Sequence, residues 1–529
     1  MSGQLRPLAL NAPGFFGINT QESEVSLEAG YATEANNCII DKYGRLGSRR
    51  GWLNVTTDNA TMSDTAYLKT LMEFKDSTGT ITYLSAGDGK LFKGQDVFTV
   101  LPVRNAANDG DVALVATADN WQSAVLNYGL GVGTEAQAFF GQRGNPLLVY
   151  NDPGTGYVWQ QVGDVGTVPT GLTTGNFDPN VVLSAFGRVW TADLSNNKQT
   201  IFYSRLLEGW DFAGAGSGIL DISSVVGSND EIVGLANHNG FLIIFCKNNI
   251  LVYSGASDPT SMALADSIIG VGCIARDSVQ NTGTDLLFLS QSGVRSLSRT
   301  VQEKSMPMRE VSMNIRDDVV ISISNNTMAN VKSAYYERDA FYLLSFPATN
   351  TVYCFDTRAP LPNGSFRVTT WSDMSFTAYC STESRTLLLG AIGGIAKYTG
   401  YTDNSETYLM SFFTSNTDAN SPSSLKFLKK ASFTTIGNNT QNYVVKYGFD
   451  YTTLFTSRSY ASSSSEVPSE YSIAEYGIGE YTGGLLISEV RVNLGGSGSV
   501  IKFGVTTEVN GAPVSIQKAE IFYKLGKTY

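Results

Sequence analysis

The residue types that most often carry catalysis are scarce and scattered in this chain. The single histidine, His238, lies in an Asn-His-Asn segment before an apolar run, and no Gly-x-Ser-x-Gly segment supplies a nucleophile for it. We therefore interpret His238 as a turn residue. One histidine and widely spaced cysteines also cannot provide the several imidazole or thiolate ligands that a transition-metal site requires. The sequence predicts neither a catalytic triad nor such a metal site.

Carboxylates are the remaining candidates for catalytic side chains, because a glycosidase needs only two of them. Asp211, the pair Asp230-Glu231 and the pair Asp317-Asp318 are candidates by residue type alone. No Ser-x-Asp-x-Gly-x-Thr-Trp box of the sialidase kind accompanies them, and we interpret them as surface or turn residues. Asp285 and the turn Asp109-Gly-Asp111 lack the alternating ligand spacing of a Ca²⁺ loop. We expect no catalytic or metal-binding residues and a protein that is not an enzyme.

Two glycine-rich segments superficially resemble nucleotide-binding loops. They are Gly129–Gly133 and Gly214–Gly218. Neither contains the lysine of a phosphate-binding loop or the complete Gly-x-Gly-x-x-Gly pattern, so we expect flexible turns and no cofactor.

The composition is typical of β-strands joined by tight turns. Apolar residues make up 42% and aromatic residues 11% of the 529 residues, whereas only 16% are charged and 53 are glycine. Helix surfaces normally use many more long charged side chains. The net charge of −11 and the lack of a dense Lys/Arg run disfavour tight binding to DNA phosphates. An acidic surface would suit a channel through which DNA slides, because a wall that attracts phosphates would retain the duplex.

Two further features indicate where the chain folds. The N-terminus lacks a basic start followed by an apolar core, and no stretch approaches the roughly 18 apolar residues of a membrane span. We therefore expect folding in a cytoplasm. The cysteines are odd in number and mostly lie in apolar runs, so we predict reduced core residues. They are Cys38, Cys246, Cys273, Cys354 and Cys380.

A strand–turn–strand pattern recurs through residues 65–405. Seven pairs of apolar runs repeat at a spacing of roughly 50 residues, which is typical of propeller blades. We predict an all-β fold with a β-propeller of six or seven blades, while two stacked sandwiches remain an alternative. The pairs are Ile81–Leu84 with Gly89–Phe92, Ala138–Phe140 with Leu147–Tyr150, Gly187–Trp190 with Ile201–Tyr203, Phe241–Phe245 with Ile250–Tyr253, Asp285–Phe288 with Gly293–Leu297, Phe341–Leu344 with Val352–Phe355, and Thr386–Leu389 with Ile395–Tyr398.

One insertion and one further domain are predicted beside the propeller. The apolar spacing after Arg309 indicates a short helix that starts near Ser312, with the hydroxyl as its N-cap. Residues 406–529 are predicted to form a C-terminal β-sandwich with a mobile Ser-rich loop at Ala461–Pro468. Its strand-like runs are Lys430–Thr435, Tyr443–Tyr447, Leu485–Asn493 and Val500–Val505, with a turn at Asn510-Gly511.

Residues 1–64 are predicted to form an N-terminal arm that makes assembly contacts. A short strand, a turn at Tyr43-Gly44 and a second strand fit its best-defined part. Its clustered guanidinium groups suit ion pairs with the carboxylates of an assembly partner, and a solvated or intramolecular hairpin is the open alternative. The candidate contacts are Asn36, Asp41, Arg45, Arg49, Arg50 and Trp52.

Three segments of the chain resemble podophage tail nozzle and packaged-DNA stabilisation proteins, a family of tail hub or tail tubular protein B-like proteins. The first comprises Ala12-Pro-Gly14, Gly30, Ala35-Asn36, Ile40-Asp41, Gly44-Arg45-Leu46 and Arg49-Arg50-Gly51; the second comprises Gly270–Arg276, Asp285–Ser290 and Gly293–Leu297; the third is Ala334–Leu344. The resemblance implies a virion protein that assembles, usually as a homo-hexamer, below the portal and adaptor rings. It also implies that the ring extends the DNA channel, helps to retain the genome until infection, contacts the duplex without sequence-specific binding, and is a candidate carrier of tail fibres.

Two other classes of protein remain as alternatives. A receptor-binding or glycan-cleaving phage tail protein could also be built on a propeller, although depolymerase spikes more often have short β-helix repeats. A cellular propeller that binds other proteins is the third alternative. Release of reducing sugars would indicate the second class, and monomeric behaviour the third.

Overall fold

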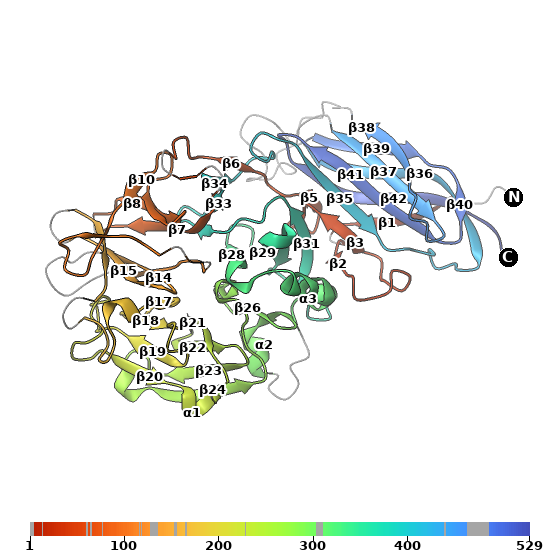
Figure 1. Cartoon of the computed structure of the whole chain (residues 1–529). Helices are drawn as coiled ribbons and strands as arrows, with labels where there is room; N and C mark the ends of the chain where they lie inside the picture. Colours follow the sequence, from red (N-terminus) through yellow and green to blue (C-terminus); the bar gives the residue numbers. More distant parts are fainter. Residues whose placement is uncertain are drawn as a thin grey trace.

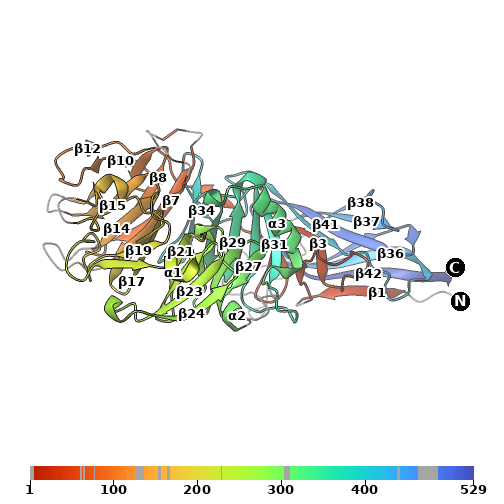
Figure 2. The ribbon, with the colours of Figure 1, turned by 60° about the horizontal axis from the view of Figure 1, so that its bottom comes forward.

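The structure is a computed structural model, and it places a β-propeller beside a β-sandwich. Figures 1 and 2 show the sandwich extending away from one side of the ring of blades, with both chain termini at the far end of the sandwich. The residues described are 5–12, 14–59, 62–63, 66–76, 78–115, 117, 119–126, 136–152, 156–163, 167–227, 229–302, 310–437, 441–462 and 486–528.

In the described residues, six sheets of four or more strands form the blades of the propeller (Figure 1). Blade 1 contains β7 (Leu68–Lys75), β8 (Ile81–Gly87), β9 (Lys90–Lys93) and β10 (Thr99–Leu101); blade 2 contains β13 (Gln122–Leu126), β14 (Gln137–Gln142), β15 (Asn145–Asn151) and β16 (Val158–Gln161), extended by β11 (Val103–Arg104) and β12 (Asp111–Val112); blade 3 contains β17 (Val181–Ala185), β18 (Arg188–Ala192), β19 (Thr200–Tyr203) and β20 (Gly218–Asp221).

The ring continues through three further blades and a smaller sheet. Blade 4 contains β21 (Ile232–His238), β22 (Phe241–Cys246), β23 (Asn249–Ser254) and β24 (Ala263–Ile269); blade 5 contains β28 (Lys332–Tyr336), β29 (Phe341–Phe346), β30 (Thr351–Asp356) and β31 (Arg367–Ser372); blade 6 contains β32 (Tyr379–Ser381), β33 (Leu387–Ala391), β34 (Gly394–Tyr398) and β6 (Trp52–Asn54). Between blades 4 and 5 lies a three-stranded sheet of β25 (Gln280–Asn281), β26 (Leu286–Ser290) and β27 (Gly293–Ser296).

The predicted propeller of six or seven blades is confirmed, and its local pairings follow the sequence pattern. Each of the seven predicted pairs of runs forms neighbouring antiparallel strands: β8–β9, β14–β15, β18–β19, β22–β23, β26–β27, β29–β30 and β33–β34. A blade cannot bury both of its faces alone, so adjacent blades stack. The ring closes where β32 and β33 of blade 6 lie against β7 of blade 1.

The N-terminal segment completes blade 6. Strand β6 is antiparallel to β34, with Trp52 opposite Tyr398 and Asn54 opposite Ala396. A strand that comes from the start of the sequence therefore fills the outer position of the last blade. This pairing ties the N-terminal segment to the propeller.

The predicted C-terminal sandwich is present, and the N-terminal segment contributes to both of its sheets. One sheet has the order β39 (Leu486–Asn493), β36 (Ser424–Gly437), β42 (Val514–Thr528), β5 (Leu46–Ser48) and β4 (Cys38–Ile40), with β1 (Arg6–Asn11) on β42 and β40 (Ser497–Gly498) on β36. The other has the order β3 (Tyr31–Asn36), β35 (Tyr408–Thr414), β41 (Ile501–Val509), β37 (Asn442–Phe449) and β38 (Thr456–Ala461), with β2 (Gly17–Ile18) on β3.

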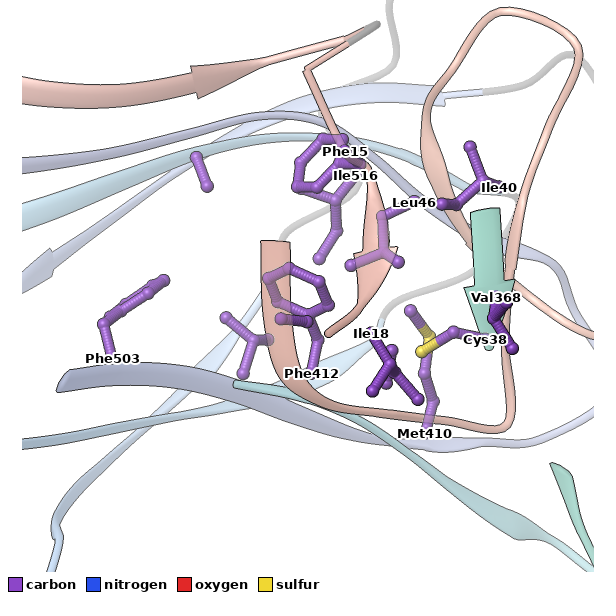
Figure 3. Packing of buried hydrophobic residues seen from close by; sticks show 14 of the residues in the cluster. Phe15, Ile18, Cys38, Ile40, Leu46, Val368, Met410, Phe412, Phe503 and Ile516 are labelled. Carbon is purple, nitrogen blue, oxygen red and sulfur yellow. The ribbon is translucent and has the colours of Figure 1, made fainter. Parts of the chain in front are cut away.

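Propeller and sandwich share one continuous sheet. Strand β3 pairs with β31 of blade 5 on one side, at Asn36 and Thr370, and with β35 of the sandwich on the other. Figure 3 shows Phe15 and Leu46 of the N-terminal segment packing near Phe412 and Ile516 of the sandwich. The largest buried cluster includes these residues together with residues of blade 5. Backbone pairing and apolar packing thus both hold the two parts together.

Helices are short and lie between strands. The predicted helix is present as η4 (Met313–Ile315) followed by α3 (Arg316–Ser324), but its predicted cap is wrong. The Ser312 hydroxyl makes no cap bond and instead accepts a hydrogen bond of 2.9 Å from the backbone N–H of Val294. The others are α1 (Ser223–Val226), α2 (Leu297–Gln302), η1 (Thr174–Asn176), η2 (Pro259–Ser261), η3 (Arg276–Ser278), η5 (Met328–Asn330) and η6 (Pro347–Thr349).

The remaining predictions concern the cysteines, the turn at Asn510-Gly511, two polar or glycine-rich loops and membrane-spanning segments. All five cysteines are free and four are buried, as predicted, with Cys380 partly exposed. The turn at Asn510-Gly511 joins β41 to β42, which lie in different sheets, so it is not a hairpin turn. The glycine cluster at 129–133 and the Ser-rich loop from residue 463 onward lie outside the described residues. No described helix has the length and apolar character needed to span a membrane.

Candidate functional site

Arg49 lies at the centre of the junction between propeller and sandwich. Its side chain has no exposed surface, and its guanidinium donates two hydrogen bonds, of 2.8 and 2.6 Å, to the carboxylate of Asp403. The Nε atom donates to Asn37 Oδ1 at 2.8 Å, and Nη2 donates to the Ser372 carbonyl at 3.2 Å. The guanidinium also lies 4.1 Å from the centre of the Tyr408 ring.

Acceptor oxygens surround the buried, positively charged guanidinium of Arg49. A guanidinium in a low-dielectric interior is tolerated when a carboxylate and further acceptors surround it, and the planar fork of arginine suits the paired oxygens. The partners come from the link between β34 and β35, from the β3–β4 turn and from the end of β31. Arg49 therefore fastens segments within the chain, and its guanidinium is not accessible to another subunit.

Asp41 and Arg45 form the turn of the β4–β5 hairpin. The Arg45 Nε atom donates to Asp41 Oδ2 at 2.6 Å, and Asp41 Oδ1 accepts from the backbone N–H groups of Tyr43 and Arg45, both at 2.9 Å. The side chain of Arg45 is nearly buried, at 7% exposure. These contacts lie within the chain and hold the hairpin rigid. They fit the alternative of an intramolecular hairpin given in the sequence analysis.

Two of the remaining predicted residues also make contacts within the chain. Asn36 donates through Nδ2 to the Ser372 hydroxyl at 3.3 Å. The Trp52 ring meets the Phe376 ring edge-to-face, with 5.5 Å between the ring centres. Its Nε1 is buried and has no hydrogen-bond partner among the described residues. Both residues therefore attach the N-terminal segment to blades 5 and 6.

Arg50 lies in a crevice beside this network. The crevice has a volume of about 410 Å³ and is formed by the β4–β5 hairpin, the β28–β29 turn, the segment after β30 and the start of β42. Its charged lining residues are Asp41, Lys42, Arg50, Arg338, Asp339 and Arg358. Four cations and two carboxylates thus meet at this place on a chain whose net charge is −11.

Burial and the neighbouring charges shift the pKa values of Arg50 and Asp339 in the crevice. Burial alone would lower the pKa of the Arg50 guanidinium, but the neighbouring Tyr401 and Asp339 outweigh this effect and raise it. Burial also raises the pKa of the Asp339 carboxyl, although nearby guanidinium groups act to lower it. Arg358 is held by Asp356, with N–O distances of 2.7 and 3.0 Å, and donates to the Ile40 carbonyl. Such a crevice can bind a carboxylate or phosphate group.

The sequence prediction missed Arg338, Asp339 and Arg358. Arg338 and Asp339 occupy the β28–β29 turn, within the third segment that carries the family resemblance. That resemblance could have drawn attention to them. Arg358 had no comparable signal, because its position beside the hairpin depends on the sheet that joins β31 to β3.

The other sequence candidates make hydrogen bonds within the chain. His238, the last residue of β21, is nearly buried, and its Nε2 lies 3.1 Å from the Asn239 amide. The Asp230 carboxylate accepts from the side chain of Asn249 at 2.7 Å, and Asp318 accepts from the Thr20 hydroxyl at 2.6 Å. Within the described ranges, no cluster of three His, Cys, Asp or Glu side chains could hold a metal ion.

Comparisons with known proteins give distant matches in fold. No family model and no curated protein matches the chain. Matching solved structures include a streptogramin B lyase (8% identity, TM-score 0.34, 64% of this chain and 94% of that chain) and the WD40 domain of Neurospora crassa Pan2 (8%, 0.35, 68% and 98%). The extracellular domain of a protein described as a hybrid two component system from B. thetaiotaomicron also matches (10%, 0.41), with 85% of this chain covering 61% of that domain.

Proposed function

We propose that the chain is a non-enzymatic structural virion protein, the nozzle or hub of a short-tailed phage. It is made in the host cytoplasm and assembles as a homo-hexameric ring below the portal–adaptor complex. The ring extends and closes the DNA channel and retains the genome until ejection. The observation that carries this proposal is the convergence, in space, of the three segments that resemble the nozzle family.

Residues of the three segments pack into one buried cluster: Ala35, Ile40 and Leu46 from the first, Ala275, Leu287, Leu289 and Val294 from the second, and Tyr342 and Leu344 from the third. Hydrogen bonds beside the segments accompany this packing: the Trp371 indole of β31 donates to the carbonyl of Cys38 at 2.8 Å. The Tyr342 hydroxyl of the third segment donates at 2.8 Å to the carbonyl of Ser278, two residues after Arg276 of the second segment. The Ser333 hydroxyl donates to the Asp277 carbonyl at 2.7 Å. This shared buried cluster supports a common architectural role for these segments.

The rigid union of the two domains also supports a structural role. The N-terminal segment gives β3 to the shared sheet, β4 and β5 to the sandwich, and β6 to blade 6. Domains joined only by a linker usually move relative to one another, whereas shared sheets and a buried core resist such motion. A channel wall that holds a packaged genome needs subunits of fixed shape.

The cationic crevice provides a surface for assembly. Lys42 and Arg338 are exposed or partly exposed at its rim, and Arg50 lies deeper. Guanidinium groups that line a crevice form strong, directional contacts with carboxylates of a neighbouring protein. We assign this crevice to contact with an acidic segment of the adaptor ring, in place of the contact predicted for Arg45 and Arg49.

Electron microscopy of the full chain tests the proposal. The purified chain is imaged alone and after mixing with the portal–adaptor complex of the same virus. A six-fold ring with an axial channel, alone or on the complex, is the expected result. A chain that stays monomeric and does not bind the complex would overturn the proposal. Release of reducing sugars from host polysaccharide by that monomer would then favour the receptor-binding or glycan-cleaving alternative.

A further inference from the structure

A polar pocket lies on the axis of the propeller, away from the junction. It has a volume of about 190 Å³ and lies between the innermost strands of several blades. Strands β7, β13, β25, β28 and β32 and the short helix η3 all supply lining residues. Figure 1 shows β7, β21 and β28 directed toward the centre of the ring. The pocket thus collects side chains from parts of the chain that are far apart in sequence.

An ion triad forms one wall of this pocket. Arg276 donates through Nε and Nη2 to the two oxygens of Asp277, both at 2.9 Å, and the Lys332 ammonium donates to Asp277 Oδ2. The side chains of Arg276 and Lys332 are each only 8% exposed. Two buried cations share one carboxylate, so the triad retains one positive charge. Retaining an unbalanced charge away from water is costly, and a bound anion would offset that cost.

The donors on this wall are not used equally. Arg276 also donates to the Asn180 side chain at 2.7 Å and to the Asn120 carbonyl at 3.0 Å, so both of its Nη atoms are engaged. An ammonium group has three donors, and the hydrogen bond that Lys332 makes with the described residues goes to Asp277 alone. Lys332 therefore keeps donors for a ligand.

Neutral donors lie around the same pocket. The hydroxyls of Thr70 and Ser123 line it and make no hydrogen bond with the described part of the chain. Gln122 accepts from the backbone N–H of Val182 at 2.8 Å through its Oε1, which leaves its NH₂ group as a donor. Thr70 is on β7, and Gln122 and Ser123 are on β13. Hydroxyl, amide and ammonium donors around one polar pocket suit an oxyanion.

We propose that this axial pocket binds a small oxyanion, a carboxylate or a phosphate, on the Lys332 ammonium and the hydroxyls of Thr70 and Ser123. The anion completes the charge balance of the triad, and the neutral donors surround its remaining oxygens. The volume limits the ligand to a small molecule or a single acidic group. The site is separate from the junction crevice and does not depend on the proposed role in a tail.

Calorimetric titration of the full chain with inorganic phosphate, and separately with succinate, at constant chloride tests this site. Saturable binding of at least one anion, with a matching rise in melting temperature, is expected. Binding of phosphate alone or of succinate alone identifies the ligand class. If neither anion binds in a saturable manner, the proposal is overturned.

Substitutions of the lining residues test whether the anion binds in this pocket. Lys332→Met should weaken binding about tenfold or more, because it removes a charge-assisted contact. The matched control is Lys75→Met, since Lys75 pairs with Glu383 at 2.8 Å on the same propeller but is 50% exposed and lies outside the pocket. The double variant Thr70→Val and Ser123→Ala leaves the triad intact and should weaken binding severalfold. Unchanged affinity in the double variant, or in a folded Lys332→Met chain, would also overturn the proposal.

Discussion

The guanidinium of Arg49 binds both carboxylate oxygens of Asp403, at 2.8 and 2.6 Å, although the two residues are 354 positions apart in the sequence. Arg49 ends the β4–β5 hairpin, and Asp403 lies between the last propeller blade and the sandwich. The contact therefore joins the N-terminal segment to the link between the two domains. It explains why Arg49, an arginine near the start of the chain, is fully buried.

Breaking this pair should destabilise the fold. Asp403→Ala leaves the Arg49 charge buried without its main partner, and a loss of about 3 kcal/mol in the free energy of unfolding is expected. Arg49→Lys keeps the charge but loses the planar fork, so it should also be destabilising. Urea denaturation measures both. Glu383→Ala is the control, because its pair with Lys75 is exposed to solvent and should contribute little to stability. Equal effects at the two pairs would contradict the assignment.

Gly51 should not tolerate a side chain. A Cβ atom added at this position would lie 1.9 Å from the Thr402 carbonyl oxygen, which is backbone and cannot move aside freely. Gly51→Ala should therefore lower the free energy of unfolding by about 1–3 kcal/mol or more. Gly175→Ala is the matched control, because no atom lies within 4 Å of its added Cβ. Thermal melting of the two variants compares them, and a neutral Gly51→Ala would show that the backbones do not approach so closely.

The axial triad should make stability depend on pH in the acid range. Burial alone would raise the pKa of the Asp277 carboxyl, but the charges of Arg276 and Lys332 outweigh it and lower the pKa from 3.8 to about 2. Because the pKa is lower in the folded state, the stabilisation is complete above the ordinary pKa and is lost as the pH falls toward about 2.

Comparison of Asp277→Asn with the natural chain isolates this contribution. The variant should lose about 3 kcal/mol at pH 7, since it leaves two buried cations without a carboxylate, and the difference should narrow between pH 4 and pH 2. Urea denaturation at several pH values gives the two curves. Asp111→Asn, at a pair in which the carboxylate is 63% exposed, is expected to change little at any pH. A difference that stays constant down to pH 2 would argue against the assigned pKa.

The crevice should control assembly rather than folding. The double variant Arg50→Ala and Arg338→Ala is expected to bind the portal–adaptor complex at least about tenfold more weakly, with melting temperature little changed. Binding of the natural chain should also weaken as salt increases, because part of the contact is exposed. Arg491→Ala is the control, since this arginine is 65% exposed on the sandwich. Assembly that is unaffected by the double variant would place the adaptor contact elsewhere.

The strand pairs that could be predicted from the sequence are those between neighbouring segments of the chain. The runs Phe241–Phe245 and Ile250–Tyr253, for example, became the neighbouring strands β22 and β23, and the other six predicted pairs behaved in the same way. Hairpins bring together residues that are close in sequence, so alternating apolar runs and turn residues specify them directly. The same reasoning found β4 and β5 around the turn at Tyr43-Gly44.

The contacts that could not be predicted from the sequence join residues that are far apart in the chain. Asn36 and Arg49 were candidate contacts because of their types, but their partners Ser372 and Asp403 come from the far end of the propeller sequence. Likewise, nothing local distinguishes a cap by Ser312 from its actual bond to Val294. Residue type limits which contacts are favourable, and the fold selects among them.

The sequence by itself determined the β-rich composition, the succession of hairpins and the free, mostly buried cysteines, because these depend on short-range pattern and on apolar side chains leaving water. Only the tertiary structure decided that β6 completes the last blade, that β3 joins propeller to sandwich, and that Arg49 is enclosed while Arg50 lines a crevice. Those outcomes depend on which distant strand edges meet when the ring closes. Their pairing satisfies backbone groups that no local segment could satisfy alone.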